Sequence, residues 1–366
     1  MDSLPNEIQI EILSYIKDKN IGKIFMLSKH LTELMQKIIL TTQLYIILNN
    51  TPVTDGCLTY LKGVYGISLF NCKKITNYGL QFLKNVKIID LNSCTNIDDG
   101  GLVYLRGVSE INLSNCSKIT NLGLSRLTGV KKIYLKNCHN ISDSGLYFLS
   151  GVHTIDLNYC NNVTSYGLGY LKGVHTITLG SNTNIRDDGM VHLKGVSVIN
   201  LSGSYMISYQ GMWYIRGVHT IDLSDCSCLL DMHLKYLQND DHNSLYSINL
   251  SRSNVTDIGL SYLEGIKQIN LTECKRITDA GLSYLKGVQQ ISLEKCKKIT
   301  DDGLKHLIGV KKISLYGCKQ ITNKGLIHLK GVQKINIGGC YKITKYGLDH
   351  LKGAIINKKE KKNYFK

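Results

Sequence analysis

The fold of this chain is decided by one repeated stretch, whose clearest copy runs from Val288 to Gly309: VQQISLEKCKKITDDGLKHLIG. We number its positions 1 to 22, so that Val, Ile, Leu, Cys and Ile stand at 1, 4, 6, 9 and 12. Thr, Asp, Gly, Leu, Leu and Gly then stand at 13, 14, 16, 17, 20 and 22. The same pattern recurs along the 366 residues at an almost constant period. A constant period of this length indicates a solenoid of stacked repeats rather than an ordinary globular domain.

Each repeat, called a rung below, is predicted to begin with a strand, Val-x-x-Ile-x-Leu. Side chains alternate along a strand, so positions 4 and 6 share one face, positions 3, 5 and 7 face the other way, and position 8 follows on the same rim. The second set is mostly polar, as in Gln290, Ser292, Glu294 and Lys295. Strands of a parallel sheet that is covered on both faces are continuous apolar runs in sequence. The alternation seen here therefore predicts a parallel sheet with one open, concave face.

The second half of the rung is predicted to be a short helix and a turn. Thr300 is suited to cap the helix, and Asp301 places a negative charge near its amino terminus. Leu304 and Leu307 lie three residues apart on the inner side, and Gly309 can adopt the left-handed conformation that ends the helix. One such rung buries too few side chains to fold alone, so the rungs depend on their neighbours.

Fourteen rungs can be counted between residues 43 and 353. A degenerate rung covers 43–63, and regular rungs of 22 residues begin at 64, 86, 108, 130, 152, 174 and 196. A longer rung begins at 218, a short one at 245, and regular rungs follow from 266, 288, 310 and 332. Residues 354–366 are predicted to be a basic, disordered tail.

The chain has twelve cysteines, and ten of them occupy position 9: Cys72, Cys94, Cys116, Cys138, Cys160, Cys226, Cys274, Cys296, Cys318 and Cys340. A regular column of this kind indicates packing in a reducing compartment rather than a disulfide framework. Zinc sites gather their ligands in close pairs, and only Cys226-Ser-Cys228 comes near that spacing. No metal and no other cofactor is predicted.

Residues 1–42 do not carry the repeat. An apolar stripe of Ile8, Ile12, Leu13 and Ile16 follows Pro5, which predicts an amphipathic helix, and two further short helices follow it. The opening Leu4-Pro5-Asn6-Glu7-Ile8 and the later Leu27-Ser28-Lys29 make this segment resemble the F-box, although His30-Leu31 stands where that family usually has a Trp.

The rungs themselves resemble the cysteine-containing leucine-rich repeats of F-box proteins, through the shared pattern Leu-x-x-Cys-x-x-Ile-Thr-Asp-x-Gly-Leu-x-x-Leu. The high use of Ile, Lys, Asn and Tyr is similar to such proteins of giant amoeba-infecting viruses. The resemblance implies an α/β fold, a horseshoe-shaped leucine-rich-repeat solenoid with a parallel concave sheet. A small all-α F-box-like domain, residues 1–42, would precede the solenoid of residues 43–353.

The same resemblance implies a non-catalytic substrate-recognition subunit of an SCF-type cullin-RING ubiquitin ligase, with ubiquitin transfer occurring in trans. A Skp-type cullin adaptor would bind Leu4, Pro5, Ile8, Ile12, Leu13 and Ile16. An unidentified client protein would bind concave-face residues at positions 5, 7 and 8: Tyr134, Lys136, Asp156, Tyr159, Asp222, Asp225 and Arg252. We expect aromatic and arginine side chains to dominate such an interface.

Two other hypotheses for the function of this chain remain open. The first is a protein-interaction scaffold whose amino-terminal helices only cap the first rung. The second is a binder of polyanions or nucleic acid, suggested by the formal net charge of +16. Acidic side chains in the concave columns, such as Asp90, Glu110 and Asp156, favour a protein partner over nucleic acid.

No apolar run reaches the length of about 18 residues that a membrane span needs, and the first residues lack the order of a signal peptide. The chain is therefore expected in the cytoplasm or nucleus, of a host cell if it is viral, with no membrane partner.

Residues 174–265 break the repeat. Position 9 becomes Asn182, Ser204 and Ser253, position 13 becomes Arg186 and Leu230, and residues 240–244 are inserted. Such local departures mark either a function or neutral drift.

Overall fold

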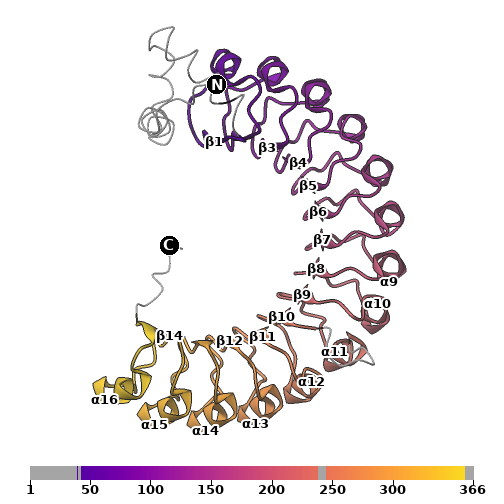
Figure 1. The fold of residues 1–366 in the computed structure, drawn as a ribbon. Coiled ribbons are helices and arrows are strands. Elements are labelled where there is room, and N and C mark those ends of the chain that lie inside the picture. Colours follow the sequence, from indigo (N-terminus) through magenta and orange to yellow (C-terminus); the bar gives the residue numbers. More distant parts are fainter. Residues whose placement is uncertain (1–38, 40–42, 238–244, 359–366) are drawn as a thin grey trace, which may run out of the picture. The chain divides into compact units, whose positions relative to one another are not determined.

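The structure is a computed structural model that describes residue 39, residues 43–237 and residues 245–358. The chain divides into two compact units, unit 1 up to Thr178 and unit 2 from Leu179. Within each unit every rung adds one strand to a sheet and one helical turn to a second layer (Figure 1). We call the sheet surface that faces away from the helices the concave face of that unit.

Parallel strands follow the order of the chain within each unit. Unit 1 contains β1 (Tyr45–Ile47), β2 (Gly66–Ser68), β3 (Ile88–Asp90), β4 (Glu110–Asn112), β5 (Lys132–Tyr134), β6 (Thr154–Asp156) and β7 (Thr176–Thr178). Unit 2 contains β8 (Val198–Asn200), β9 (Thr220–Asp222), β10 (Ser247–Asn249), β11 (Gln268–Asn270), β12 (Gln290–Ser292), β13 (Lys312–Ser314), β14 (Lys334–Asn336) and β15 (Ile355–Asn357). Equivalent positions pair, as Ile291 does with Ile313.

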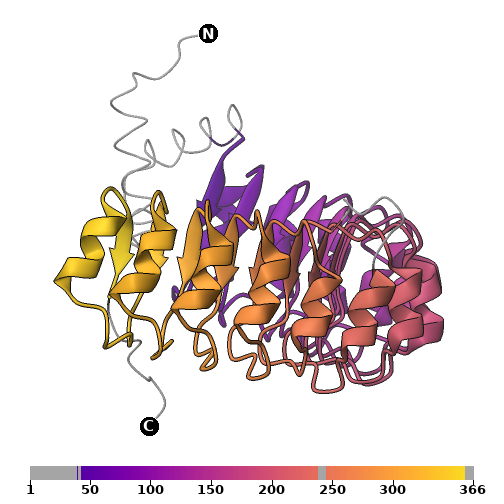
Figure 2. The same ribbon diagram turned by 90° about the horizontal axis from the view of Figure 1, so that it is seen from below.

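Short helices form the second layer, and those of unit 2 stand in a row (Figure 2). The α-helical segments are α4 (Asp55–Leu58), α5 (Asn77–Leu80), α6 (Asp99–Leu102), α7 (Asn121–Leu124), α8 (Asp143–Leu146), α9 (Asp187–Met190), α10 (Tyr209–Tyr214), α11 (Asp231–Leu237), α12 (Asp257–Ser261), α13 (Asp279–Leu282), α14 (Asp301–Leu304), α15 (Asn323–Leu326) and α16 (Lys345–Leu348). The 3₁₀ turns are η1 (Thr59–Leu61), η2 (Gln81–Leu83), η3 (Val103–Leu105), η4 (Tyr147–Leu149), η5 (Gly167–Leu171), η6 (Val191–Leu193), η7 (Ser283–Leu285), η8 (Lys305–Leu307), η9 (Ile327–Leu329) and η10 (Asp349–Leu351).

The core lies between the two layers and is built from the positions that the repeat predicts. In the rung from Val288, the side chains of Leu293, Cys296, Ile299 and Leu304 are fully buried. The regular strands show the expected alternation, with a buried residue between two partly exposed ones. The parallel sheet with one open face is therefore confirmed.

The strands are shorter than the six-residue motif suggests. Only positions 3 to 5 are extended, as in Gln290–Ser292. The next backbone N–H groups still donate to the following rung, Leu293 to Ser314 at 2.8 Å and Lys295 to Tyr316 at 2.7 Å. Lys295 then takes a φ of 58°, which turns the chain away from the sheet.

The predicted helix caps are present. The Oγ1 atom of Thr300 accepts a hydrogen bond from the backbone N–H of Asp302 at 3.3 Å, and Gly309 has a φ of +87°. Both features recur in other rungs. The starts and ends of the helices therefore lie where the sequence predicts them.

Position 14 has a second role besides the predicted one. Asp301 lies in the first turn of its own helix, as the sequence predicts, and its carboxylate also accepts two hydrogen bonds from the next rung. The backbone N–H of Thr322 donates to Oδ1 at 2.8 Å, and the Thr322 hydroxyl donates to Oδ2 at 2.5 Å. Eleven such bonds from a position-13 N–H to a position-14 Asp or Asn are found among the described residues, and we call them the carboxylate ladder.

The carboxylate ladder also explains the glycine at position 16. A Cβ atom on Gly325 would overlap Oδ1 of Asp301, and the same overlap would occur at Gly303 with Asp279. These glycines have no positive φ, so the constraint is space for the carboxylate of the preceding rung rather than backbone conformation.

One interruption of the ladder accounts for several irregular residues of unit 2. Tyr209 replaces the position-14 acid, so the N–H of Leu230 at position 13 has no carboxylate to receive it. His233 stands at the glycine position of the same rung, and its Nδ1 accepts that N–H at 3.1 Å. Burial lowers the pKa of His233, which favours the neutral ring that this acceptor role needs. The inserted residues 240–244 lie outside the described residues.

The sheet continues beyond Gly353, where the sequence placed the start of the tail. Residues Ile355–Asn357 form β15, which pairs with β14 through Ile356 and Ile335. Its two isoleucines lack the opening valine and the closing leucine of the motif, so the pattern did not reveal it. Residues 359–366 lie outside the described residues.

The cysteine column is confirmed as packing. Cys296 is fully buried, and its thiol donates to the carbonyl oxygen of Leu271 in the preceding rung at 3.0 Å. Burial raises the pKa of Cys94 to about 12 and that of Cys116 to about 11, so these thiols stay protonated. All ten position-9 cysteines are free thiols that are buried.

We expect Asp301→Ala to lower the free energy of unfolding by roughly 1–3 kcal/mol, because it leaves the Thr322 N–H and hydroxyl without their acceptor. Asp301→Asn should cost less, since asparagine occupies this position at Asn77 and Asn323. Asp302→Ala is the matched control, because the Asp302 side chain is 84% exposed. Urea unfolding measures all three, and an equal effect at positions 301 and 302 would contradict the ladder.

Lowering the pH from about 7 to 5 should reduce stability through His233, because protons bind more readily to this ring in the unfolded chain than in the folded one. His233→Asn keeps an acceptor for the Leu230 N–H without a titrating ring, so its stability should fall less over the same range. Denaturant titrations at several pH values test this, with the exposed His139→Gln as matched control. Parallel curves for wild type and His233→Asn would refute the assignment.

Candidate functional site

The six residues predicted to bind an adaptor, Leu4, Pro5, Ile8, Ile12, Leu13 and Ile16, lie outside the described residues. The seven predicted client-binding residues are described, four of them in unit 1 and three in unit 2. Each set is considered within its own unit.

In unit 1 the strands β5 and β6 bring two predicted residues together. Tyr134 and Asp156 are paired in register, and their side chains share the concave face. Beside them, Lys132 and Glu110 form an ion pair at 3.2 Å, which the sequence had not singled out. Burial, and next the charge of Glu110, raise the pKa of Tyr134, so its hydroxyl stays a hydrogen-bond donor.

Lys136 and Tyr159 form the second pair of unit 1. The Lys136 Nζ atom lies 5.9 Å from the centre of the Tyr159 ring, within the range of a cation–π contact. Tyr159 is 42% exposed, so much of its ring is free for a partner. Burial raises the pKa of neighbouring Asp156, while the Asn158 N–H and the charge of Lys136 oppose that rise.

Two of the predicted acids have a structural role that the sequence did not reveal. Oδ1 of Asp156 accepts the backbone N–H of Asn158 at 2.8 Å, and Oδ1 of Asp222 accepts that of Ser224 at 2.8 Å. Asn249 and Asn270 make the same bond in other rungs, so position 5 closes the turn after the strand. One carboxylate oxygen of each acid is therefore already engaged.

Position 8 of unit 2 carries a ladder of alternating charges. The Arg252 guanidinium donates to both carboxylate oxygens of Asp225, and Lys295 donates to Glu273. The hydrogen bond from Arg252 holds the pKa of Asp225 below its usual range, and Lys295 does the same for Glu273. Asp222 joins this surface through a 3.1 Å hydrogen bond from Asn249.

The same position has an unusual backbone. Tyr159, Asp225, Arg252, Glu273 and Lys295 all have φ between 58° and 60°, the left-handed region that favours glycine and asparagine. Other rungs place asparagine or glycine there, as at residues 71, 115, 203 and 317. Ion pairs between rungs explain why the four charged residues are found at this strained position. Tyr159 makes no such ion pair, so the fold itself does not explain this bulky, exposed side chain.

The concave face of unit 2 also holds an open groove of about 540 Å³ across β10 to β15. Its polar lining consists of amides and hydroxyls, for example Gln268, Asn270 and Ser292, together with Glu294, Lys312 and Lys334. The groove offers hydrogen bonds over several rungs and no enclosed apolar cavity, which suits a macromolecular surface better than a small molecule.

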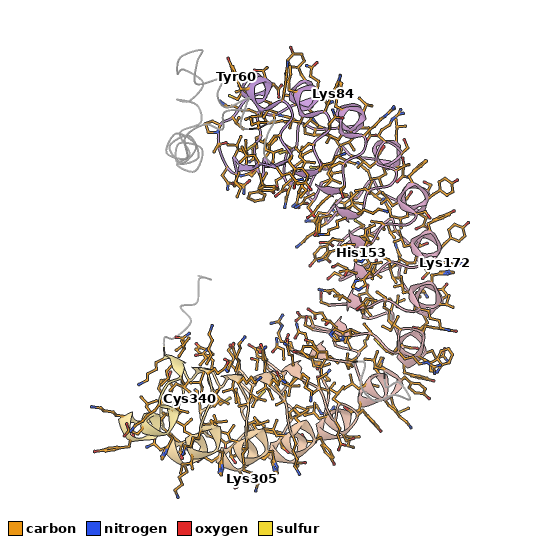
Figure 3. All side chains as sticks on the ribbon, in the orientation of Figure 1. Tyr60, Lys84, His153, Lys172, Lys305 and Cys340 are labelled. Carbon is orange, nitrogen blue, oxygen red and sulfur yellow. The ribbon has the colours of Figure 1, made fainter. Side chains whose placement is uncertain are left out.

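A metal site would require several of the His, Cys, Asp and Glu side chains to lie close together. Within residues 39, 43–237 and 245–358, no group of three or more His, Cys, Asp or Glu side chains could hold a metal ion. His153, on the strand side in Figure 3, stacks on His175 with ring centres 4.6 Å apart. Each Nδ1 lies 3.2–3.3 Å from the hydroxyl of the following threonine, and the pair extends the packing of neighbouring rungs.

Among known proteins, no family model matches this chain, and no curated protein matches it either. Solved structures do match its fold. A chain of the yeast Rad7–Elc1 complex aligns with 14% identity and a TM-score of 0.54, over 97% of this chain and 98% of that one. An internalin (inlF) of Listeria monocytogenes aligns with 16% identity and a TM-score of 0.56, over 93% and 97%.

A chain of the TLR13–ssRNA13 complex aligns with 13% identity and a TM-score of 0.55, over 86% of this chain and 53% of that one. These neighbours are leucine-rich-repeat proteins, so the chain has a leucine-rich-repeat fold. At such identities the likeness extends to the fold alone, and the function has to be argued from the chain's own surfaces.

Replacing Tyr159 should separate backbone strain from surface function. Tyr159→Asn suits the left-handed backbone and should leave the free energy of unfolding unchanged or raise it by about 0.5–1 kcal/mol. Tyr159→Val, β-branched at the same φ, should lower it by roughly 1–3 kcal/mol. Urea unfolding of both variants provides the test, and equal destabilisation would show that the Lys136 contact, rather than backbone conformation, dominates at this site.

Proposed function

We propose that this chain is a non-catalytic receptor that binds a client protein on its concave faces and a Skp-type cullin adaptor through residues 1–42. It would serve as the substrate-recognition subunit of an SCF-type cullin-RING ubiquitin ligase. Ubiquitin transfer would occur in trans, on lysines of the client held close to the conjugating enzyme. Holding two reactants in one complex raises their effective concentration, and this is the whole mechanistic contribution of such a receptor.

The observation that carries the client-binding part is the exposed Tyr159 on a backbone that favours glycine or asparagine. Lys136 contacts its ring as a cation, and Tyr134 and Asp156, which are paired in register, add a phenol and a carboxylate to the concave face of unit 1. Tyrosine is one of the residues enriched among the hot spots of protein interfaces.

The adaptor-binding part rests on the F-box-like sequence of residues 1–42, above all on Leu4-Pro5-Asn6-Glu7-Ile8. One structure with the same fold is a complex of two proteins, Rad7 and Elc1, which supports the general idea of a repeat protein with a bound partner. The non-catalytic role is supported by the protonated, buried thiols of the cysteine column and by the engagement of Asp225 and Glu273 in ion pairs.

A scaffold without an adaptor is the second candidate. It would use the same concave faces, and residues 1–42 would only cover the first rung. No helix among the described residues is long and apolar enough to cross a membrane. For either candidate we propose a location in the cytoplasm or nucleus, of the host cell if the protein is viral.

Co-purification of the full chain with a Skp-type adaptor tests the proposal. The double variant Pro5→Ala, Ile8→Asp should reduce adaptor recovery at least tenfold, because a charge is placed on the apolar stripe of the first helix. Tyr159→Asn is the matched control and should retain the adaptor while losing captured client. Adaptor binding that ignores the double variant, or no adaptor binding by wild type, would leave the scaffold as the better description.

A further inference from the structure

A strongly basic rim follows the last strands of unit 2. We define the basic rim as positions 8, 10 and 11 of the rungs beginning at 266, 288, 310 and 332. It carries seven cations, Lys275, Arg276, Lys295, Lys297, Lys298, Lys319 and Lys342. Glu273 is the one carboxylate at these positions, so the rim has a large excess of positive charge.

Most of the positive charge of the basic rim is not paired with a carboxylate among the described residues. Glu273 is engaged by Lys295. None of the ion pairs found among the described residues involves Lys275, Lys297 or Lys298. These three lysines are exposed, so their ammonium groups are available to an external anion.

The repeat architecture does not require cations at these positions. At position 11, the Asn96, Asn140 and Asn162 side chains of unit 1 donate to a backbone carbonyl oxygen of the preceding rung, at 2.6–2.8 Å. Arg276, Lys298 and Lys342 replace that amide in unit 2, and no such bond is found for them. These three cations therefore replace a bond between rungs by a charge, whereas Gln320 at position 11 of the rung from 310 keeps the bond, to the carbonyl oxygen of Lys297.

The same side chains, Glu273, Lys275, Lys295, Lys297 and Lys298, line an open pocket of about 350 Å³ between two successive rungs. Its surface is mostly apolar, which places the alkyl parts of the lysines along the pocket, and lysines arranged in this way keep their ammonium groups in solvent. Lysine ammonium groups act as flexible point charges, in contrast to the planar fork with which arginine recognises a single phosphate. No aromatic side chain lines the pocket, and Tyr341 is the single aromatic residue at the rim positions, whereas binding of single-stranded nucleic acid relies on successive aromatic side chains.

We propose that the basic rim of unit 2 binds an acidic peptide segment, a run of aspartate or glutamate residues in the client. Four rungs spaced at about 4.8 Å span roughly 14 Å, which four or five residues of an extended peptide at about 3.3 Å each would cover. This proposal names the chemistry of the partner and rests on the proposed role of the chain as a client receptor.

Fluorescence anisotropy of the full chain with a labelled decapeptide rich in glutamate tests the proposal directly. The triple variant Lys275→Glu, Lys297→Glu, Lys298→Glu should weaken binding at least tenfold at about 50 mM salt, where charge interactions are little screened. The matched control is Lys73→Glu, Lys74→Glu, Lys118→Glu, which changes the same exposed rim positions in unit 1 and should weaken binding less than about twofold.

Equal loss in the two triple variants would overturn the proposal, because binding would then follow net charge alone. Tighter binding of a phosphoserine peptide, or of a single-stranded RNA decamer, at this rim would also overturn it by identifying a different partner. A glutamine-rich decapeptide should not bind. Adaptor recovery measured on the same variants reports separately on the proposed function, since that step depends on residues 1–42 and not on the rim.

Discussion

The carboxylate ladder is the interaction on which the rest of the structure depends. Each position-14 carboxylate or amide receives the backbone N–H that begins the next helical turn, as Asp301 does for Thr322. The bond crosses from one rung to the next, so the position-13 N–H of each rung depends on the preceding rung, while the threonine cap satisfies a later N–H within the rung itself. Glycine at position 16 follows from it, because the incoming carboxylate occupies the space of a side chain. Stacking is therefore enforced by a polar group as well as by the apolar core.

Most of the fold could be predicted because the repeat states each feature many times. The strand face, the buried cysteine column and the helix caps all follow from local alternation, burial and capping, and all are found. The partner of Asp301 could not be predicted in this way, because it lies 21 residues away and composition within one rung gives no sign of it. β15 could not be predicted for a related reason. A last strand needs only part of the motif, because it can pair with the exposed edge of β14.

The candidate site was predicted in part. Tyr134, Lys136, Asp156 and Tyr159 do share one face of unit 1, because their positions in the rung determine their direction. The positive φ of position 8 was not apparent from the sequence. Because of it, Tyr159 is not an ordinary surface residue but a tyrosine in a backbone conformation that tyrosine disfavours. For Asp156 and Asp222 the structure adds a structural role to the predicted client-binding one, because each accepts a hydrogen bond that closes its own turn.

The trio Tyr209, Leu230 and His233 shows how a repeat of this kind can change over time. Loss of the acid at position 14 leaves an N–H without an acceptor, and a histidine at position 16 supplies one only where no carboxylate already fills that space. Each of the two substitutions compensates for the other across a rung boundary, so we expect their effects on stability to be coupled rather than additive. An exception to the motif in one rung is therefore best understood together with the residues of its neighbour.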